Sequence, residues 1–171
     1  MPASNSPTRV LGSRRSALVA AMLAIAMMAV FAGLTLGLPG AGVTSTTLVT
    51  ANLDETVHFN SDRVRIQTKD ATDVRVQRLD FTPGGFSGWH HHPGIIIVAV
   101  QSGAVTLWMA DCSSTTYGPG FPDGSVFVEG GDHPVQATSA TGATVYVTYV
   151  APSADPPVFR TEDDLPADHC D

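Results

Sequence analysis

The chain has 171 residues, of which 43% are hydrophobic and 15% are charged, a composition that excludes a disordered acidic tail and a coiled coil. Nine Lys and Arg residues against sixteen Asp and Glu residues give a formal charge of −7, which argues against nucleic acid as a partner because binding it needs a basic surface. Sixteen glycines and twelve prolines favour many turns within one small domain.

The N-terminal part, residues 1–42, has the pattern of a targeting segment. Three arginines precede an uncharged apolar run from Ala17 to Leu38, which predicts a helical secretory signal or an N-terminal membrane anchor. A helix over this run would rise about 33 Å, which suits either interpretation. Ser13-Arg14-Arg15 resembles a twin-arginine export signal. We therefore expect the rest of the chain to be extracytoplasmic, either secreted or anchored to the cell membrane by this segment if it stays uncleaved.

The next part of the chain divides into a linker and a β-rich body. Residues 43–60 are rich in Thr, Gly and Ala and are predicted to be a linker. Residues 61–152 hold short strand-like segments with turn signals such as Pro83-Gly84-Gly85 between most of them, which predicts an all-β sandwich or barrel. The expected strands are Val64–Thr68, Val74–Phe81, Gly88–His92, Ile95–Gln101, Val105–Ala110, Ser125–Glu129, His133–Thr138 and Ala143–Val150.

The two cysteines both follow the predicted export segment. Cys112 lies in a polar stretch, residues 111–116, which we interpret as a loop. Cys170 is the penultimate residue of an acidic, Pro-rich tail, residues 153–171, which we expect to be irregular and solvated. Two cysteines in an oxidising compartment permit a single internal disulfide, which is the favoured pairing. Free surface thiols, or a bond between two copies in a homodimer, are the alternatives.

Histidines are the strongest candidates for chemistry. Alternate residues of an extended segment share a face, so His90 and His92 are expected to point the same way and His91 the opposite way. His133, on a later segment, is placed to approach them across a barrel, and three imidazoles suit a divalent transition metal such as Fe, Mn, Zn, Ni or Cu. A His-rich turn exposed to water is the alternative. Glu129 and Asp132 are interpreted as a strand-end charge and a turn residue, with a ligand role as the other possibility.

The spacing around these histidines resembles the cupin superfamily. The first cupin motif is matched from Gly84 through His90-His91-His92 to Gly103, with Ile96 in place of the motif's Glu. The second motif is matched more loosely, by His133 and a preceding glycine. The resemblance implies a single cupin-type jelly-roll β-barrel over residues 61–152, preceded by the signal or anchor helix. It also implies a metal held at the barrel mouth by His90, His92 and His133 without the family's carboxylate.

The favoured function is an exported cupin domain that binds a divalent metal and a small-molecule ligand at the barrel mouth. Such a domain would act as a metal-dependent, dioxygenase-like oxidoreductase or as a non-catalytic binding or sensing module of the cell envelope. A structural envelope protein whose histidines bind nothing is a third hypothesis. The sequence singles out no further catalytic group.

Overall fold

The computed structural model describes residues 40–170, and the all-β prediction is confirmed there. The predicted signal or anchor helix lies in residues 1–42, almost wholly outside the described residues. Within residues 40–170 no helix has the length and apolar character needed to cross a membrane.

Strands make up most of the described chain, and nearly all of them join one sheet. They are β1 (Ala41–Leu53), β2 (His58–Asn60), β3 (Arg65–Gln67), β4 (Thr72–Phe86), β5 (His90–His91), β6 (Ile95–Gly103), β7 (Val105–Met109), β8 (Ser114–Tyr117), β9 (Val126–Gly130), β10 (Val135–Ser139), β11 (Ala143–Pro152) and β12 (Thr161–Glu162).

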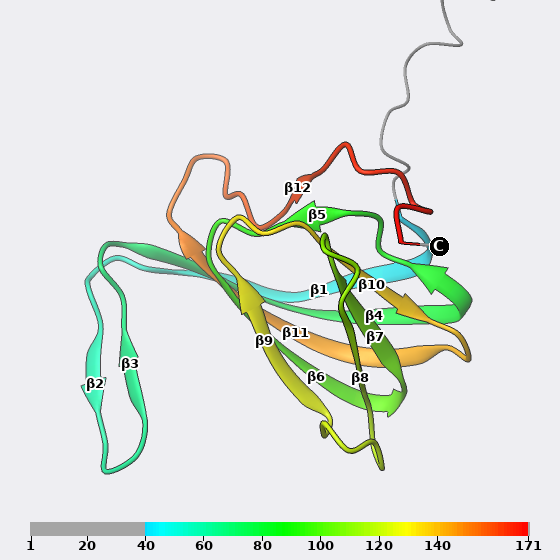
Figure 1. Ribbon diagram of the computed structural model, residues 1–171. Coiled ribbons are helices and arrows are strands. Elements are labelled where there is room, and N and C mark those ends of the chain that lie inside the picture. Colours follow the sequence, from blue (N-terminus) through cyan, green and yellow to red (C-terminus); the bar gives the residue numbers. More distant parts are fainter. Residues whose placement is uncertain (1–39, 171) are drawn as a thin grey trace, which may run out of the picture. The chain divides into compact units, whose positions relative to one another are not determined.

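The sheet is antiparallel and curves into a nearly closed barrel. Its main path runs β12-β5-β10-β4-β11-β6-β9, with β1 beside β4, and with β7 and β8 continuing outward from β10. Figure 1 shows the long strands β1, β4, β11 and β6 curving side by side, with the short strands β5 and β10 facing them. The β2–β3 hairpin forms a separate two-stranded sheet that extends away from the barrel.

The core lies between these facing strands and follows the two-residue period of a strand. On β11 every second residue is buried, including Val145 and Val147. The adjacent strand β6 turns Ile96 and Val98 to the same interior, and Phe127 of β9 completes this part of the core. Each such side chain stabilises the barrel by about 1.5–3 kcal/mol through removal of its apolar surface from water.

The prediction that residues 43–60 form a linker is wrong for most of that range, because the range contains most of β1 and all of β2. β1 pairs antiparallel with β4 along almost its whole length, from Ala41 opposite Phe86 to Leu53 opposite Thr72. Nearly every β1 side chain is exposed, so the strand lacks the apolar alternation by which strands are usually recognised. Its threonines favour extended backbone, and the ladder with β4 supplies the pairing.

The predicted turn at Pro83-Gly84-Gly85 is also wrong, because β4 continues through it to Phe86. The extra residues form an irregularity in the pairing with β1, where Ala41 faces Phe86 but Val43 faces Phe81. Gly85 passes so close to Gly42 that a Cβ there would lie 2.7 Å from the Gly42 carbonyl oxygen. The glycine is therefore required by the bulge rather than by a chain reversal.

The predicted disulfide is confirmed, with the Cα atoms of Cys112 and Cys170 5.3 Å apart. The stretch expected to be a polar loop is instead a tight turn at Cys112, whose φ is 65°, followed by β8. Its threonines pair with β7, as in the opposition of Thr106 and Thr116. The tail is also more ordered than its composition predicts, because β12 pairs with β5 and Phe159 is buried in the core.

Candidate metal centre

Two imidazoles meet at the edge of the barrel interior. His90 is on β5 and His92 follows it, and their side chains are 5% and 3% exposed. Their ring centroids lie 4.7 Å apart with the planes nearly perpendicular, at 89°. The shared face predicted from the strand period is therefore present.

Backbone carbonyls fix the tautomer of both rings. His90 Nδ1 donates to the Gly88 carbonyl oxygen at 2.8 Å, and His92 Nδ1 donates to the Phe159 carbonyl oxygen at 2.6 Å. A carbonyl only accepts, so each Nδ1 carries the proton and each Nε2 keeps a lone pair. This is how metal-binding histidines are usually oriented in proteins.

Glu129 brings a carboxylate to the same place. Its Oε1 lies 3.8 Å from His92 Nε2, and one ligand atom from each of His90, His92 and Glu129 lies within 4.8 Å of the others. The Glu129 side chain is only 11% exposed, and its Oε2 is buried without a hydrogen-bond partner within residues 40–170. A buried carboxylate oxygen with no donor is costly, so a cation at this position would relieve it.

The surroundings keep both imidazoles neutral. Burial, with the nearby Arg160 guanidinium adding to it, lowers the pKa of His90 to about 3. Burial also lowers the pKa of His92 to about 4, although the hydrogen bond to Phe159 opposes the shift. Neutral imidazole is the form that binds a metal ion, so both rings are ready as ligands at neutral pH.

The pKa of the Glu129 carboxyl group shifts in the opposite direction, and burial is again the main cause. Burial raises the pKa of Glu129 to about 7, against the opposing effect of Arg160. Without a cation this group is therefore largely protonated below pH 7. Two neutral imidazoles and one carboxylate fit a divalent transition metal, with coordination positions left open.

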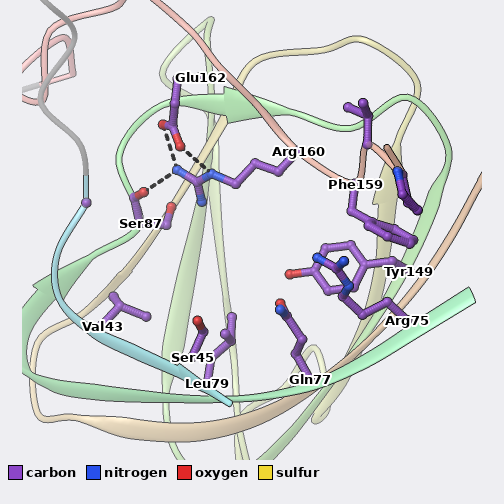
Figure 2. A pocket seen from close by; sticks show the side chains of 13 residues that line it. Val43, Ser45, Arg75, Gln77, Leu79, Ser87, Tyr149, Phe159, Arg160 and Glu162 are labelled. Atoms are coloured by element: carbon purple, nitrogen blue, oxygen red, sulfur yellow. Dashed lines mark hydrogen bonds and ion pairs between the residues drawn. The ribbon is translucent and has the colours of Figure 1, made fainter. Parts of the chain in front are cut away.

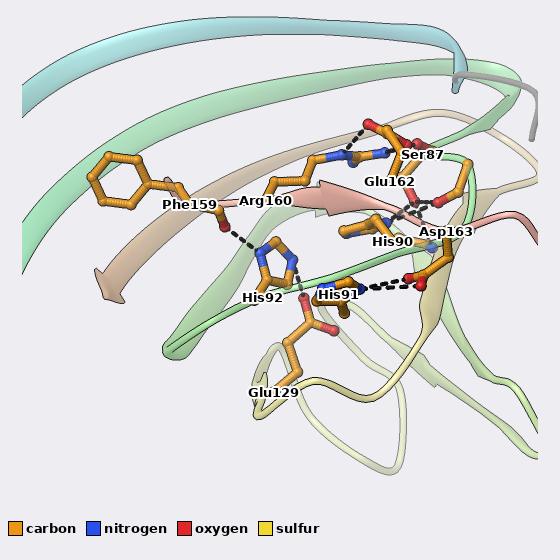
Figure 3. A network of polar contacts seen from close by, with 11 residues as sticks. Ser87, His90, His91, His92, Glu129, Phe159, Arg160, Glu162 and Asp163 are labelled. Atoms are coloured by element: carbon orange, nitrogen blue, oxygen red, sulfur yellow. Dashed lines mark hydrogen bonds and ion pairs between the residues drawn. The ribbon is translucent and has the colours of Figure 1, made fainter. Parts of the chain in front are cut away.

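The other sequence-predicted residues lie outside this group. His133 is exposed on the loop between β9 and β10, and the structure does not bring it to His90 and His92. His91 points away from the pair, as expected, and its Nδ1 lies 3.0 Å from an Asp163 carboxylate oxygen (Figure 3). Asp132, with a φ of 57°, is an exposed turn residue.

Glu129 occupies a position that strand register explains. Ile96 of β6 stands where the cupin motif has its Glu, and Glu129 of β9 is directly opposite it in the antiparallel ladder. Directly opposed residues point to the same face with Cβ atoms about 4.5–5.5 Å apart. Ile96 is 2% exposed, so this face is the barrel interior. The carboxylate is thus supplied from the neighbouring strand, and the pairing of β6 with β9 favours the ligand role that the sequence leaves as the alternative for Glu129.

Residues 157–163, called the strap below, close the site from outside the barrel. Phe159 supplies the carbonyl that orients His92, and Arg160 donates through Nη2 to the Ser87 carbonyl oxygen at 2.6 Å. Asp163 donates its backbone N–H to the Trp89 carbonyl oxygen at 3.0 Å. Figure 3 shows the strap passing over the three consecutive histidines. The role of the strap in the site is not apparent from the sequence, because the composition of the tail predicts only a solvated segment.

Comparisons with known proteins are confined to structure. No protein-family model and no curated protein matches the chain. Among solved structures it is similar to a cupin-2 domain protein from Rhodospirillum rubrum, at 18% identity over 75% of this chain and 72% of that one, with a TM-score of 0.46. A cupin superfamily protein from Desulfitobacterium hafniense matches at 12% identity over 67% and 83%, with a TM-score of 0.45.

A polyketide cyclase from Streptomyces resistomycificus matches at 15% identity over 77% of this chain and 79% of that one, with a TM-score of 0.49. The chain also matches an oxalate oxidase, but it spans only 40% of that protein's length. All four are less than 25% identical to the chain and have TM-scores below 0.5, so no ligand or activity is transferred from them. The strand order gives the fold, a nearly closed antiparallel β-barrel, which is the architecture that the resemblance to the cupin superfamily implies.

Proposed function

We propose that this protein binds one divalent transition metal ion through His90, His92 and Glu129 and presents it to a small molecule at the mouth of the barrel. The observation that carries the proposal is the meeting of two Nε2 lone pairs with a buried carboxylate that has an unpartnered oxygen. When bound, such a metal supplies Lewis-acid or redox chemistry at its open positions.

The protein's own residues set the conditions for that chemistry. The Gly88 and Phe159 carbonyls hold the two rings in the ligand tautomer. Two neutral imidazoles and one carboxylate leave a divalent ion with about one net positive charge, which favours an anionic or polarisable ligand beside it. The buried surroundings limit the access of water to the ligand atoms.

Metal content of purified variants tests the ligand set. Protein produced without a His tag is loaded with Fe²⁺, Mn²⁺, Zn²⁺, Ni²⁺ or Cu²⁺, desalted and analysed for its metal-to-protein ratio. Wild type is expected to retain close to one ion per chain with at least one of these metals, whereas His92→Ala and Glu129→Gln lose it. His91→Ala and His133→Ala are matched controls from the same segments and are expected to keep the metal.

Two results would change the proposal. A loss of metal in His133→Ala equal to that in His92→Ala would return the third ligand position to His133. Wild-type protein that retains none of the five metals would rule out the metal site altogether.

A non-catalytic binding or sensing module is the second candidate, and it is favoured by the burial of His90 and His92, which are 5% and 3% exposed. Turnover separates the two candidates. Metal-loaded protein is incubated with O₂ and a panel of small carboxylic acids, diketones and thiols, and product formation is followed by mass spectrometry. Metal-dependent product supports the enzyme, and saturable binding without product supports the module.

A further inference from the structure

A cavity of about 500 Å³ lies between the strap and the inner face of β1, β4 and β11. It is separate from the three proposed metal ligands, none of which lines it, but Tyr149 and Phe159 belong to its wall and pack against each other at 5.8 Å between ring centroids. Tyr149 also contacts the His92 ring, at 5.6 Å. A molecule in this cavity would therefore lie one side chain away from the metal centre. Its size is within the range of small-molecule sites.

One positive charge in the wall has no carboxylate partner. Within residues 40–170 Arg75 makes no ion pair: its Nε donates to Thr50 Oγ1 at 3.2 Å, and its guanidinium carbon lies 4.1 Å above the centre of the Phe159 ring. A half-buried guanidinium with unused N–H groups favours an anion.

The second guanidinium in the wall is already neutralised. Arg160 donates to both carboxylate oxygens of Glu162, through Nε at 2.7 Å and Nη2 at 2.8 Å. Arg160 and Glu162 both line the cavity, so together they add no net charge to it. The cavity is left with the single uncompensated charge of Arg75, which matches one carboxylate rather than a polyanion.

The remaining wall combines a hydrogen-bond donor with apolar surface. Figure 2 shows Tyr149 and Gln77 beside Arg75, with Val43 and Leu79 on the floor. The Tyr149 hydroxyl forms no hydrogen bond to any described residue, and a phenol donates to an oxyanion readily. Val158 and the Phe159 ring add apolar surface at the strap. A ligand with one charged end and an apolar body satisfies both parts of this wall.

We propose that this cavity binds a small monocarboxylate with an apolar body, held by the Arg75 guanidinium and the Tyr149 hydroxyl and covered by the strap. The formal charge of −7 on the chain disfavours multiply charged anions such as phosphate, which a lone Arg would otherwise attract. The proposal does not rest on the metal, because Arg75 and Tyr149 need no ion in order to bind a carboxylate.

Isothermal titration of the full chain with benzoate tests the proposal. EDTA is present throughout, so the outcome is independent of the metal site. Benzamide has the same shape without the charge, and its affinity is expected to be lower by about tenfold or more, the effect of a charge-assisted hydrogen bond. Inorganic phosphate is expected to bind more weakly than benzoate.

Variants on one strand locate the charge. Arg75→Gln is expected to weaken benzoate binding by about tenfold or more, and Arg75→Lys, which keeps the charge but loses the planar fork, by less. Arg78→Gln is the matched control, because Arg78 lies on the opposite face of β4 and is bonded to Asp80 at 2.8 Å. Tyr149→Phe keeps the ring contacts and is expected to cost several-fold.

Three results would overturn the proposal: equal affinities of the wild type for benzoate and benzamide, equal losses in Arg75→Gln and Arg78→Gln, or wild-type protein that binds phosphate as tightly as benzoate. A wild type that binds no benzoate at millimolar concentration overturns it as well. If Arg75→Gln does not fold, the wild-type comparison of the probes and the Arg75→Lys protein still decide the question.

Discussion

His92 shows how a backbone contact prepares a side chain for chemistry. Its Nδ1 is held by a carbonyl oxygen from Phe159, which lies far along the chain. The ring is buried, so its charged form would be poorly solvated, and this lowers its pKa to about 4 although the Phe159 hydrogen bond favours the charged form. Orientation and charge state are thus set together, before any ion is present.

Glu129 makes the stability of the metal-free protein dependent on pH. Its pKa in the folded protein is about 7, above the ordinary 4.5, so its stabilising contribution is present below pH 4.5 and is lost as the pH rises to 7. Glu129→Gln should remove this loss. The difference in unfolding free energy, variant minus wild type, is expected to grow by about 3 kcal/mol between pH 4.5 and 8.

Urea unfolding in EDTA at several pH values measures this difference. The two buried histidines act in the opposite direction, since their lowered pKa values cost stability as the pH falls below 6.5. Their contribution is common to both proteins and cancels in the comparison. A difference that does not change with pH would mean that Glu129 is not buried as a neutral acid.

A carboxylate exchange between neighbouring strands tests the register. Glu129→Gln is expected to lose the metal, and adding Ile96→Glu to it should restore binding to within about tenfold of wild type, because the two side chains are in-register neighbours on one face. Ile96→Glu alone places a second carboxyl beside the first, and it should shift preference toward Mn²⁺ or Fe²⁺. To measure this preference, each protein is loaded from a mixture of metals and the bound metals are identified by elemental analysis. Failure of the double variant to bind any metal, while it remains folded, would show that position 96 does not face the site.

Individual residues also show where the sequence stops being informative. The period of two places His90 and His92 together, and a motif match predicts the same pair. For Glu129 the sequence favours a strand-end charge and leaves a ligand role as the alternative, because its partner Ile96 is 33 positions away and their opposition depends on the pairing of β6 with β9. His133 fits the spacing of the second motif, but the loop that carries it turns its side chain to solvent.

At the level of elements, the strap behaves as part of the barrel wall. Phe159 is 5% exposed within the core cluster, and β12 pairs with β5. The tail that contains it is acidic and Pro-rich, so the residue pattern predicts no strand there, just as it predicts none in the Thr-rich β1. Both elements are stabilised by backbone pairing with a neighbour, a property that a residue pattern does not record.

In reduced protein, limited proteolysis should therefore cleave the tail after the strap and leave the strap itself intact. Reduction of the disulfide frees residues 164–170, and cleavage by an acid-specific protease at Asp164 and Asp168 is expected to become fast. Trypsin cleavage after Arg160 should stay slow, because β12 and the buried Phe159 hold that segment. Mass spectrometry of the fragments identifies the sites.

The β2–β3 hairpin provides an internal control for this experiment. Arg63 and Arg65 are exposed, so trypsin should cut there at similar rates in oxidised and reduced protein. Equally fast trypsin cleavage after Arg160 and at the hairpin in reduced protein would show that the disulfide alone holds the strap.

For the molecule as a whole, the disulfide closes a loop that begins before β8 and includes β8 to β12. Cys112 and Cys170 are separated by 58 positions, and in the chain-entropy model such a crosslink stabilises the fold by up to about 4 kcal/mol. Replacing both cysteines by Ser should lower the unfolding free energy by up to that amount, measured in guanidinium. Reductant should lower the stability of wild type to that of the variant and leave the variant unchanged; a wild type insensitive to reductant would contradict the prediction.

The strap follows β1 to β11 in the chain, and this order has a consequence for biosynthesis. During translation the ribosome releases β1 to β11 before Phe159, so the barrel can form while His92 still lacks its carbonyl partner and the cavity lacks its cover. The nascent protein would then pass through an open stage in which the future ligand atoms are accessible from outside. Docking of the strap then adds the carbonyl partner of His92 and the cover of the cavity to a barrel that has already formed.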